Sequence, residues 1–251
     1  MKAFIKLVVM SATYRQSSIA SPESRSKDPG NELLSRGPRF RLSGELIRDQ
    51  ALAASGLLVN KVGGPSVRPY MPKGVWDETS VYGNLRNYKA DKGDGLYRRS
   101  LYTIWKRTAG PPSMLLFDAP NRETCTVRRS KTNTPLQALS LLNEITFVEA
   151  SQALAKRMMK SGGDSDAEKI AFGFRALTAR NPNKVEIGVL VDGLREDTQR
   201  FKDNPDEAKA FLASVKAGFL EGVEEEEVAS LAALALAANV MLNLDEVVTR
   251  E

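Results

Sequence analysis

The hydrophobic pattern is most regular in the second half of the chain, where it predicts a series of helices. Over residues 133–159, Thr134 or Asn133 can cap a long helix, and Pro135 suits the first helical position. The apolar stripe predicted for this helix consists of Leu136, Leu139, Leu142 (or Leu141), Ile145 and Val148. Further helices are predicted over residues 167–179, 182–201, 205–217 and 223–244, with Asn181 or Asn183 as a cap beside Pro182.

The first half of the chain has one clear amphipathic helix, within residues 39–58. Gly56 is a plausible stop near its end. A charged stripe of Arg41, Glu45, Arg48 and Asp49 is either solvated or part of a buried ionic network. The apolar positions that recur at helical spacing are Leu42, Leu46, Ile47, Ala51 and Ala54.

Loops fill much of the remaining first half. Residues 2–11 are interpreted as the end of a helix or a buried segment, and residues 18–31 as a surface loop. Residues 59–96 are dense in Gly and Pro, and we expect their aromatic rings to pin the loop to the body. These rings are Tyr70, Trp76, Tyr82 and Tyr88. The next segment, 97–108, fits a helix and a strand equally well.

These patterns predict an all-α or mainly α fold, an irregular helical domain with long Gly/Pro-rich loops packed on the helices. We expect one domain over residues 1–251, with a basic, loop-rich half (1–135) and an acidic, helical half (136–251). The first half has 23 Lys and Arg against 11 Asp and Glu, and the second has 13 against 20. A basic half suggests an anionic partner such as acidic polysaccharide, or packing of the two halves on each other. Nucleic acid is disfavoured because no helix has a one-sided basic face.

Two features of the composition limit the kinds of catalytic and metal sites that the chain can form. The chain has no histidine, which excludes His-dependent triads and the commonest metal ligand. Its single cysteine, Cys125, permits no intrachain disulfide and no Cys-rich zinc site. We therefore expect neither a metal nor a cofactor. The most apolar stretch, residues 228–244, is interpreted as a buried core helix, and we expect no transmembrane segment.

The densest group of chemically capable side chains surrounds residues 98–137. It is interpreted first as a structural lattice of arginines and carboxylates, and second as an anion-binding site. A catalytic role is the third reading, with Asp118 and Glu123, or Asp77 and Glu78, as the nominated carboxylate pairs. The candidate residues are Arg98, Arg99, Asp118, Arg122, Cys125, Arg128, Arg129 and Gln137, of which Cys125 is expected to be buried and Gln137 to hydrogen-bond the preceding loop.

Several motifs resemble one known family, the planctomycete-type domain of unknown function 1553. They are "SATYRQSS", "RGPRFRLSGELIRDQALAASGLL", "GGPSVRPY", "YRRSLYTIWKR", "FDAPNRETCTVRRSKTNTPLQALSLLN" and "LTARNPNKVE". The resemblance implies the C-terminal part of a large exported bacterial protein that often carries a haem c domain and a companion domain upstream. It implies a link to polysaccharide use and a location in the cell envelope or outside the cell. It also implies that this chain is truncated at its N-terminal side.

The opening "MKAFIKLVVM" is too short an apolar run for a signal peptide, and Lys6 interrupts it. A chain expressed from Met1 is therefore expected in the cytoplasm. The activity remains unknown at this stage. We expect a non-catalytic structural or interaction module of a bacterial cell-envelope multidomain protein rather than an enzyme. The alternative is a polysaccharide-active hydrolytic or anionic-glycan-binding domain, with its site beneath the loop of residues 59–96.

Overall fold

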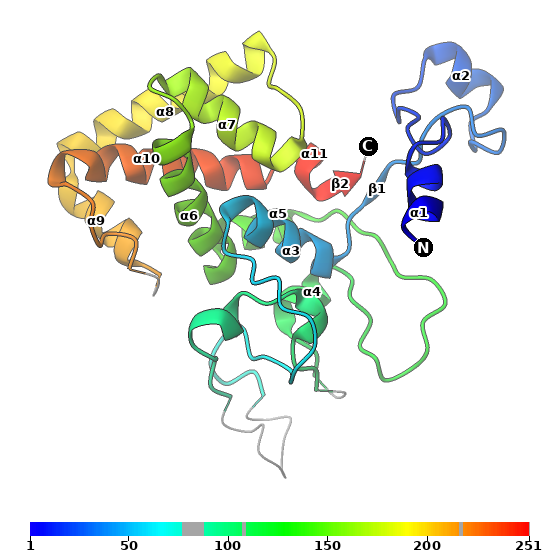
Figure 1. Cartoon of the computed structure of the whole chain (residues 1–251), viewed down its shortest axis with the longest axis horizontal. Helices are drawn as coiled ribbons and strands as arrows, with labels where there is room; N and C mark the ends of the chain where they lie inside the picture. Colours follow the sequence, from blue (N-terminus) through cyan, green and yellow to red (C-terminus); the bar gives the residue numbers. More distant parts are fainter. Residues whose placement is uncertain (77–87, 107–108, 216–217, 251) are drawn as a thin grey trace.

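Helix α10, Val228–Leu242, lies at the centre of the fold (Figure 1). Its sequence, VASLAALALAANVML, is apolar on all sides, which is typical of a helix surrounded by others. Small alanine side chains let the neighbouring helices approach closely, and most α10 residues are buried. These neighbours are α6 (Ile145–Ser161), α7 (Asp166–Thr178), α8 (Lys184–Asp203) and α9 (Pro205–Ala213).

The computed structural model describes residues 1–76, 88–106, 109–215 and 218–250. Helices make up 54% of the structure, with eleven α-helices and one two-stranded sheet in the described residues. The mainly α fold predicted from the sequence is therefore confirmed. No helix in these ranges is long and apolar enough to cross a membrane.

Side-chain caps fix the helix starts. The Thr134 hydroxyl accepts a hydrogen bond from the backbone N–H of Gln137, whose side chain accepts one from the backbone of Thr134. Asn183 and Glu186 form the same reciprocal cap at α8. Each cap satisfies backbone N–H groups that have no partner within their helix. The predicted caps at Thr134 and Asn183 are thus confirmed.

The long helix predicted over residues 133–159 is wrong in one respect, because it is two helices. Helix α5, Pro135–Asn143, ends before Glu144, whose backbone is extended (φ −71°, ψ 134°). The Glu144 carboxylate accepts a hydrogen bond from the backbone N–H of Thr146 and so caps α6. A capping residue needs a non-helical backbone, which breaks the run. The predicted stripe is only partly confirmed: Leu136, Leu139 and Leu142 are exposed, whereas Leu141, the stated alternative to Leu142, is buried. Ile145 and Val148 are partly buried against a small core cluster.

Helix α3, Gly44–Ser55, packs on α6 and ends at Gly56, whose left-handed backbone (φ 82°) confirms the predicted stop. Ile47, Ala51 and Ala54 face the core as predicted, but Leu46 is exposed. Its Arg48 side chain is 5% exposed, so the charged stripe is partly buried.

The described residues between α3 and α5 are mostly irregular, as predicted. It contains single turns of helix at η1 (Gly93–Leu96) and η2 (Ser100–Tyr102), and the short helix α4 (Pro112–Leu116). Isolated parallel bridges join Val59 to Arg98 and Val67 to Thr103. The segment from residue 97, for which helix and strand fitted the sequence equally well, therefore forms one turn of helix at residues 100–102, with bridges at Arg98 and Thr103 on either side. A third single turn, η3 (Glu225–Glu227), leads into α10.

Residues 1–39 form a lobe that stands apart from the helical body (blue in Figure 1). The lobe contains α1 (Lys2–Val9) and α2 (Pro22–Lys27), and it joins the body through β1 (Phe40–Arg41). Strand β1 pairs antiparallel with β2 (Thr249–Arg250), which follows α11 (Asp245–Val248). Of the two alternatives for residues 2–11, the helix is confirmed and the buried segment is not, because α1 has no buried residue. The expectation for residues 18–31 changes, since α2 lies inside the predicted surface loop.

Gly44 allows α3 to approach α4, and its replacement by alanine is expected to destabilise the fold. A Cβ at Gly44 would lie 2.9 Å from Cβ of Phe117 and 3.3 Å from the carbonyl oxygen of Met114, neither of which can move freely. We expect Gly44→Ala to lower the free energy of unfolding by about 1–3 kcal/mol in urea denaturation. Gly188→Ala is the matched control, because nothing lies within 4 Å of its Cβ on α8. It should raise stability by about 0.5–1 kcal/mol; equal effects of the two changes would contradict the packing argument.

Candidate functional site

A cleft of about 1590 Å³ opens between the irregular loop after α3 and the start of α6. It exceeds the roughly 300–1,000 Å³ of typical small-molecule sites, so it has room for part of a polymer. The cleft lies under the predicted loop, but no residue of 117–125 is among its described lining. Its walls consist of residues 70–76, 88–93, 96–97 and 143–145, together with Leu57 and Phe219.

Arg48 fastens the far end of this loop to α3. Its guanidinium donates hydrogen bonds to the carbonyl oxygens of Leu96 (2.6 Å) and Arg98 (3.0 Å), and to the Ser100 hydroxyl (3.2 Å). The neighbouring Asp49 accepts a hydrogen bond from the backbone N–H of Ser100 (2.7 Å). Burial lowers the pKa of Arg48 below its usual value, and the nearby carboxylates of Asp49 and Glu144 oppose that shift. Residues 96–100 are therefore held by one buried cation.

Arg98 is a second buried arginine that donates hydrogen bonds to backbone carbonyls, here at the start of the loop. It is 5% exposed, and its guanidinium donates to the carbonyl oxygens of Lys61, Gly63 and Pro65. The guanidinium also stacks on the ring of Tyr102, 3.7 Å from the ring centroid. Both terminal nitrogens of the Arg98 guanidinium therefore donate hydrogen bonds to backbone carbonyl groups.

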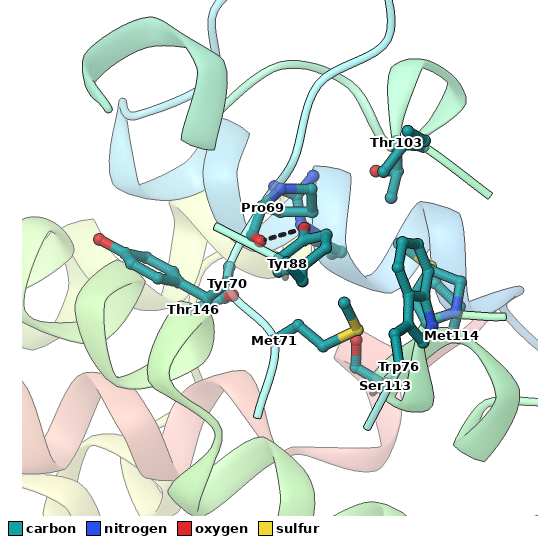
Figure 2. Close-up of a pocket in the computed structure, with 12 residues that line it drawn as sticks. Pro69, Tyr70, Met71, Trp76, Tyr88, Thr103, Ser113, Met114 and Thr146 are labelled. Carbon is teal, nitrogen blue, oxygen red and sulfur yellow. Dashed lines mark hydrogen bonds between the residues drawn. The ribbon is translucent and has the colours of Figure 1, made fainter. Parts of the chain in front are cut away.

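Aromatic rings hold the middle of the loop, as predicted. Trp76 is 1% exposed and packs edge-on against Tyr88, with 5.1 Å between ring centroids. The Tyr88 hydroxyl donates to the carbonyl oxygen of Pro69 (2.6 Å; Figure 2). The cavity enclosed beside these rings measures about 10 Å³, which is the size of one water molecule and too small for a ligand. Tyr82 lies outside the described residues.

Glu149 is a fully buried carboxylate beneath the cleft. Its Oε1 accepts hydrogen bonds from the hydroxyls of Tyr97 (2.8 Å) and Tyr70 (3.1 Å), whose rings line the cleft. The Tyr70 hydroxyl points away from the small cavity (Figure 2). Within the described part of the chain, Oε2 of Glu149 has no hydrogen-bond partner. Burial raises the pKa of Glu149, and the two tyrosine hydrogen bonds only partly oppose this shift, so this carboxyl holds its proton more tightly than an exposed glutamate does.

The same environment keeps the tyrosines protonated. Burial and the charge on Glu149 raise the pKa of Tyr70 to about 12. Burial and the hydrogen bond to Glu149 raise the pKa of Tyr97 as well. Both hydroxyl hydrogens point to Glu149, so each tyrosine oxygen can still accept a hydrogen bond but has no second hydrogen to donate.

A second carboxylate, Glu144, lies at the cleft wall where α6 begins. Besides capping the helix, it accepts a hydrogen bond from the Thr146 hydroxyl (3.0 Å). Burial raises its pKa above the usual value, and the hydrogen bonds from Thr146 and the charge on Arg48 oppose this shift. Both oxygens of Glu144 are therefore engaged by residues of the chain.

The rim of the cleft is basic. Lys73, Lys89 and Lys92 line it and are exposed, and in the described ranges none lies within ion-pair distance of a carboxylate. Asp91, between two of them, accepts a hydrogen bond from the backbone N–H of Arg68 (2.8 Å) and so braces the loop.

The residues nominated from the sequence do not form one site. Arg98 contacts residues 61–65, and Arg99 makes only long hydrogen bonds, 3.3–3.4 Å, to Oδ1 of Asn60. Arg129 pairs with Glu45 (2.9 Å), more than 80 residues away in the chain. Arg122 stacks on Trp105, 4.3 Å from the ring centroid.

Two of the nominated residues do share a contact. Asp118 accepts hydrogen bonds from the backbone N–H (2.6 Å) and hydroxyl (2.9 Å) of Thr132, and Gln137 donates to the same hydroxyl (3.0 Å). Gln137 also donates to the carbonyl oxygen of Leu116, so it hydrogen-bonds the preceding loop as expected. Cys125 and Arg128 are exposed, and for Cys125 this corrects the expectation of burial. The nominated carboxylate pair Asp77 and Glu78 lies outside the described residues.

Sequence reasoning missed Glu149 and Glu144, the two carboxylates beside the cleft. The signal for Glu149 was present: it is a lone carboxylate between Val148 and Ala150 in a helix whose inner face is apolar. A charge at such a position requires a partner from elsewhere in the fold. The partners, Tyr70 and Tyr97, come from a loop 52–79 residues earlier, which no local pattern indicates.

Residues 1–194 match the family described as PSD1, protein of unknown function (DUF1553). The match covers 194 of the 251 residues. The chain belongs to the DUF1553 family. The cleft walls contributed by the loop and by α6 lie within the matched part of this DUF1553 chain, whereas α9 and α10 follow it. No curated protein and no solved structure matches the chain.

The ionisable groups in and around the cleft of this DUF1553 chain are mostly engaged by other groups of the chain. Across residues 1–76, 88–106, 109–215 and 218–250, no three His, Cys, Asp or Glu side chains are grouped closely enough to hold a metal ion. The terminal guanidinium nitrogens of Arg48 and Arg98 donate to groups of the chain, and Glu149 and Glu144 accept hydrogen bonds from tyrosines or from Thr146. Among the described cleft residues, the exposed side chains include those of the three lysines.

Loss of the Arg48 guanidinium is expected to release the loop. Arg48→Met leaves three buried acceptors without a donor, so the free energy of unfolding should fall by about 3 kcal/mol or more. Arg99→Met is the matched control, because its side chain is exposed and its hydrogen bonds are long. That change should stay within about 0.5 kcal/mol. Urea denaturation of both variants measures the difference, and similar losses in both would refute the role of Arg48.

The Glu149 carboxyl should make stability depend on pH in a defined direction. Its pKa in the folded protein is above the usual 4.5, so the folded state binds this proton more tightly than the unfolded chain. The free energy of unfolding should therefore fall as pH rises from about 4.5 through the folded pKa. Glu149→Gln keeps an oxygen that accepts from both tyrosines, and it should remove this part of the pH dependence.

Denaturation of wild type and Glu149→Gln at a series of pH values tests this expectation. Glu144 titrates in the same direction and should leave a residual slope in the variant. Glu226→Gln, at an exposed position, should keep the wild-type profile. An unchanged slope in Glu149→Gln would show that this carboxyl does not bind its proton more tightly in the folded state.

Proposed function

We propose that this DUF1553 chain is a non-catalytic interaction module of a cell-envelope protein and that its cleft binds an anionic polysaccharide. The observation that carries the proposal is the large cleft beside the start of α6, with three exposed lysines on its rim. The family resemblance supports the cell-envelope setting, and with it an upstream haem c domain as a partner in the full-length protein.

Charge favours an anionic ligand. Both oxygens of Glu144 and one oxygen of Asp91 are engaged by groups of the chain, and burial raises the pKa of Glu149 beneath the cleft. The lysine side chains of the rim, by contrast, extend into solvent. A ligand at the rim therefore meets more exposed positive than negative side chains among the described cleft residues, which attracts carboxylate or sulfate groups.

The floor of the cleft suits sugar rings. Tyr70 and Tyr97 present aromatic surface together with hydroxyl oxygens that can only accept hydrogen bonds. Sugar hydroxyls can supply the matching donors, and the apolar faces of pyranose rings can pack on the aromatic surface. An acidic polysaccharide combines hydroxyl donors with repeated negative charge and thus matches both floor and rim.

The same contacts argue against catalysis. Glycoside hydrolysis uses two carboxyl groups that face the scissile bond, one as acid and one as base or nucleophile. Glu144 is committed to the cap of α6, and Glu149 is covered by the two tyrosines. One observation favours hydrolysis as the second candidate: the raised pKa of Glu149 is the property of a general acid.

Binding to a matched pair of polymers tests the proposal. We expect the chain to bind dextran sulfate but not unmodified dextran in affinity electrophoresis, and binding should weaken as salt increases. Replacement of Lys73, Lys89 and Lys92 by glutamine should weaken binding by about tenfold, since an exposed charge pair contributes about 0.5 kcal/mol. Carboxymethyl dextran distinguishes a carboxylate preference from a sulfate preference.

The matched control is the glutamine triple variant at Lys160, Lys184 and Lys202, which are exposed lysines outside the cleft. This variant should bind dextran sulfate as the wild type does. An equal loss in both triple variants would indicate nonspecific attraction and overturn the proposal. New reducing ends from an acidic polysaccharide, abolished by Glu149→Gln, would establish the hydrolytic candidate instead.

A further inference from the structure

Helix α1 has an apolar face that no other part of the described structure covers. None of its eight residues is buried, and Phe4 and Leu7 are 66% and 71% exposed. Phe4 lies three residues before Leu7 and four before Val8, so these side chains share one side of the helix. Ile5 and Val9 extend the same side by the same spacing. Isolated exposed apolar residues are ordinary, but a continuous face of this kind indicates a contact surface.

The charges around this face are of one sign. Lys2 and Lys6 are four residues apart and form a basic flank beside the apolar side chains. Arg15 follows, and the sequence contains no Asp or Glu before Glu23. Over residues 1–41 there are eight Lys and Arg against three Asp and Glu.

The position of α1 leaves this face accessible. The lobe of residues 1–39 projects from the body (Figure 1). It is held by the pairing of β1 with β2 and by Arg250, which stacks on Tyr14 and Phe40. These contacts are made by residues that follow α1 in the chain, and none of the α1 residues is buried by them.

We propose that α1 docks on the surface of a lipid bilayer that contains anionic phospholipid. An interfacial helix places its apolar side chains at the boundary of headgroups and acyl chains, while flanking lysines contact anionic headgroups. The apolar face and basic flank of α1 have this arrangement, and the absence of nearby carboxylates favours a negative partner. The contact lies flat on the bilayer and does not span it.

Co-sedimentation of the full chain with large vesicles tests this surface. We expect binding to vesicles of phosphatidylcholine and phosphatidylglycerol (7:3), and much weaker binding to phosphatidylcholine alone or in 0.5 M NaCl. Phe4→Gln with Leu7→Gln should lower the partition coefficient on the order of tenfold or more. Lys2→Gln with Lys6→Gln should lower it on the order of tenfold and remove the preference for anionic vesicles.

The matched control is Val185→Gln with Val189→Gln, two valines of α8 that are 75% and 68% exposed. This variant should bind as the wild type does. Circular dichroism should show the same helix content in every variant, because none of the replaced side chains is buried. Failure of the wild type to sediment with anionic vesicles, or unchanged binding by the Phe4/Leu7 variant, would overturn the proposal. A wild-type dimer that this variant converts to a monomer would overturn it too, by assigning the face to a second copy of the chain.

The vesicle experiment is independent of the cleft. The glutamine variant at Lys73, Lys89 and Lys92 leaves α1 intact, so it should bind vesicles as the wild type does. Loss of vesicle binding in that variant would place the lipid contact at the cleft rim and not at α1.

Discussion

A guanidinium that enters a protein interior needs acceptors for its N–H groups, and Arg48 finds them in a segment that has no regular structure of its own. The carbonyls of residues 96 and 98 and the hydroxyl of Ser100 converge on this one side chain. Because α3 packs on α6, the same contact sets the distance between the loop and the start of α6. The width of the cleft therefore depends on Arg48, although this side chain is not part of the described cleft lining. Arg98 acts in the same way on residues 61–65, because its guanidinium donates hydrogen bonds to their carbonyl oxygens.

The floor and the rim of the cleft differ in how far their ionisable groups are removed from water. Glu149 is surrounded by protein, and burial raises the pKa of its carboxyl above the usual value. The lysines of the rim keep their hydration because they extend from loop positions. The buried carboxyl beneath the cleft and the exposed lysines on its rim are therefore separate in the structure. The proposed binding role depends on this separation.

Much of the helical framework was predictable, because capping residues and apolar spacing act locally. Thr134, Asn183 and Gly56 mark boundaries that the structure confirms. The break at Glu144 was not predictable from periodicity, since glutamate suits a helix interior and only its capping contact with Thr146 ends the run. The candidate site could not be predicted from local patterns. The residues of the arginine-rich motif are close in sequence, but Arg129 pairs with Glu45 of α3 and Arg122 stacks on Trp105. The grouping of Glu149 with Tyr70 and Tyr97 exists only after the loop folds back on α6.

The place of α10 has a consequence for where the domain can be divided. Similarity to the DUF1553 family ends at residue 194, within α8, while α10 packs against α6 and α8 from beyond that point. The C-terminal strand also pairs with β1, next to the lobe that carries α1. A fragment cut at residue 194 would lack α9 and α10, and it would expose to water the faces of α6 and α8 on which α10 packs. The part of the chain that matches the family therefore depends for its core on a helix outside the match, and β1 beside the first lobe depends on β2 for its pairing.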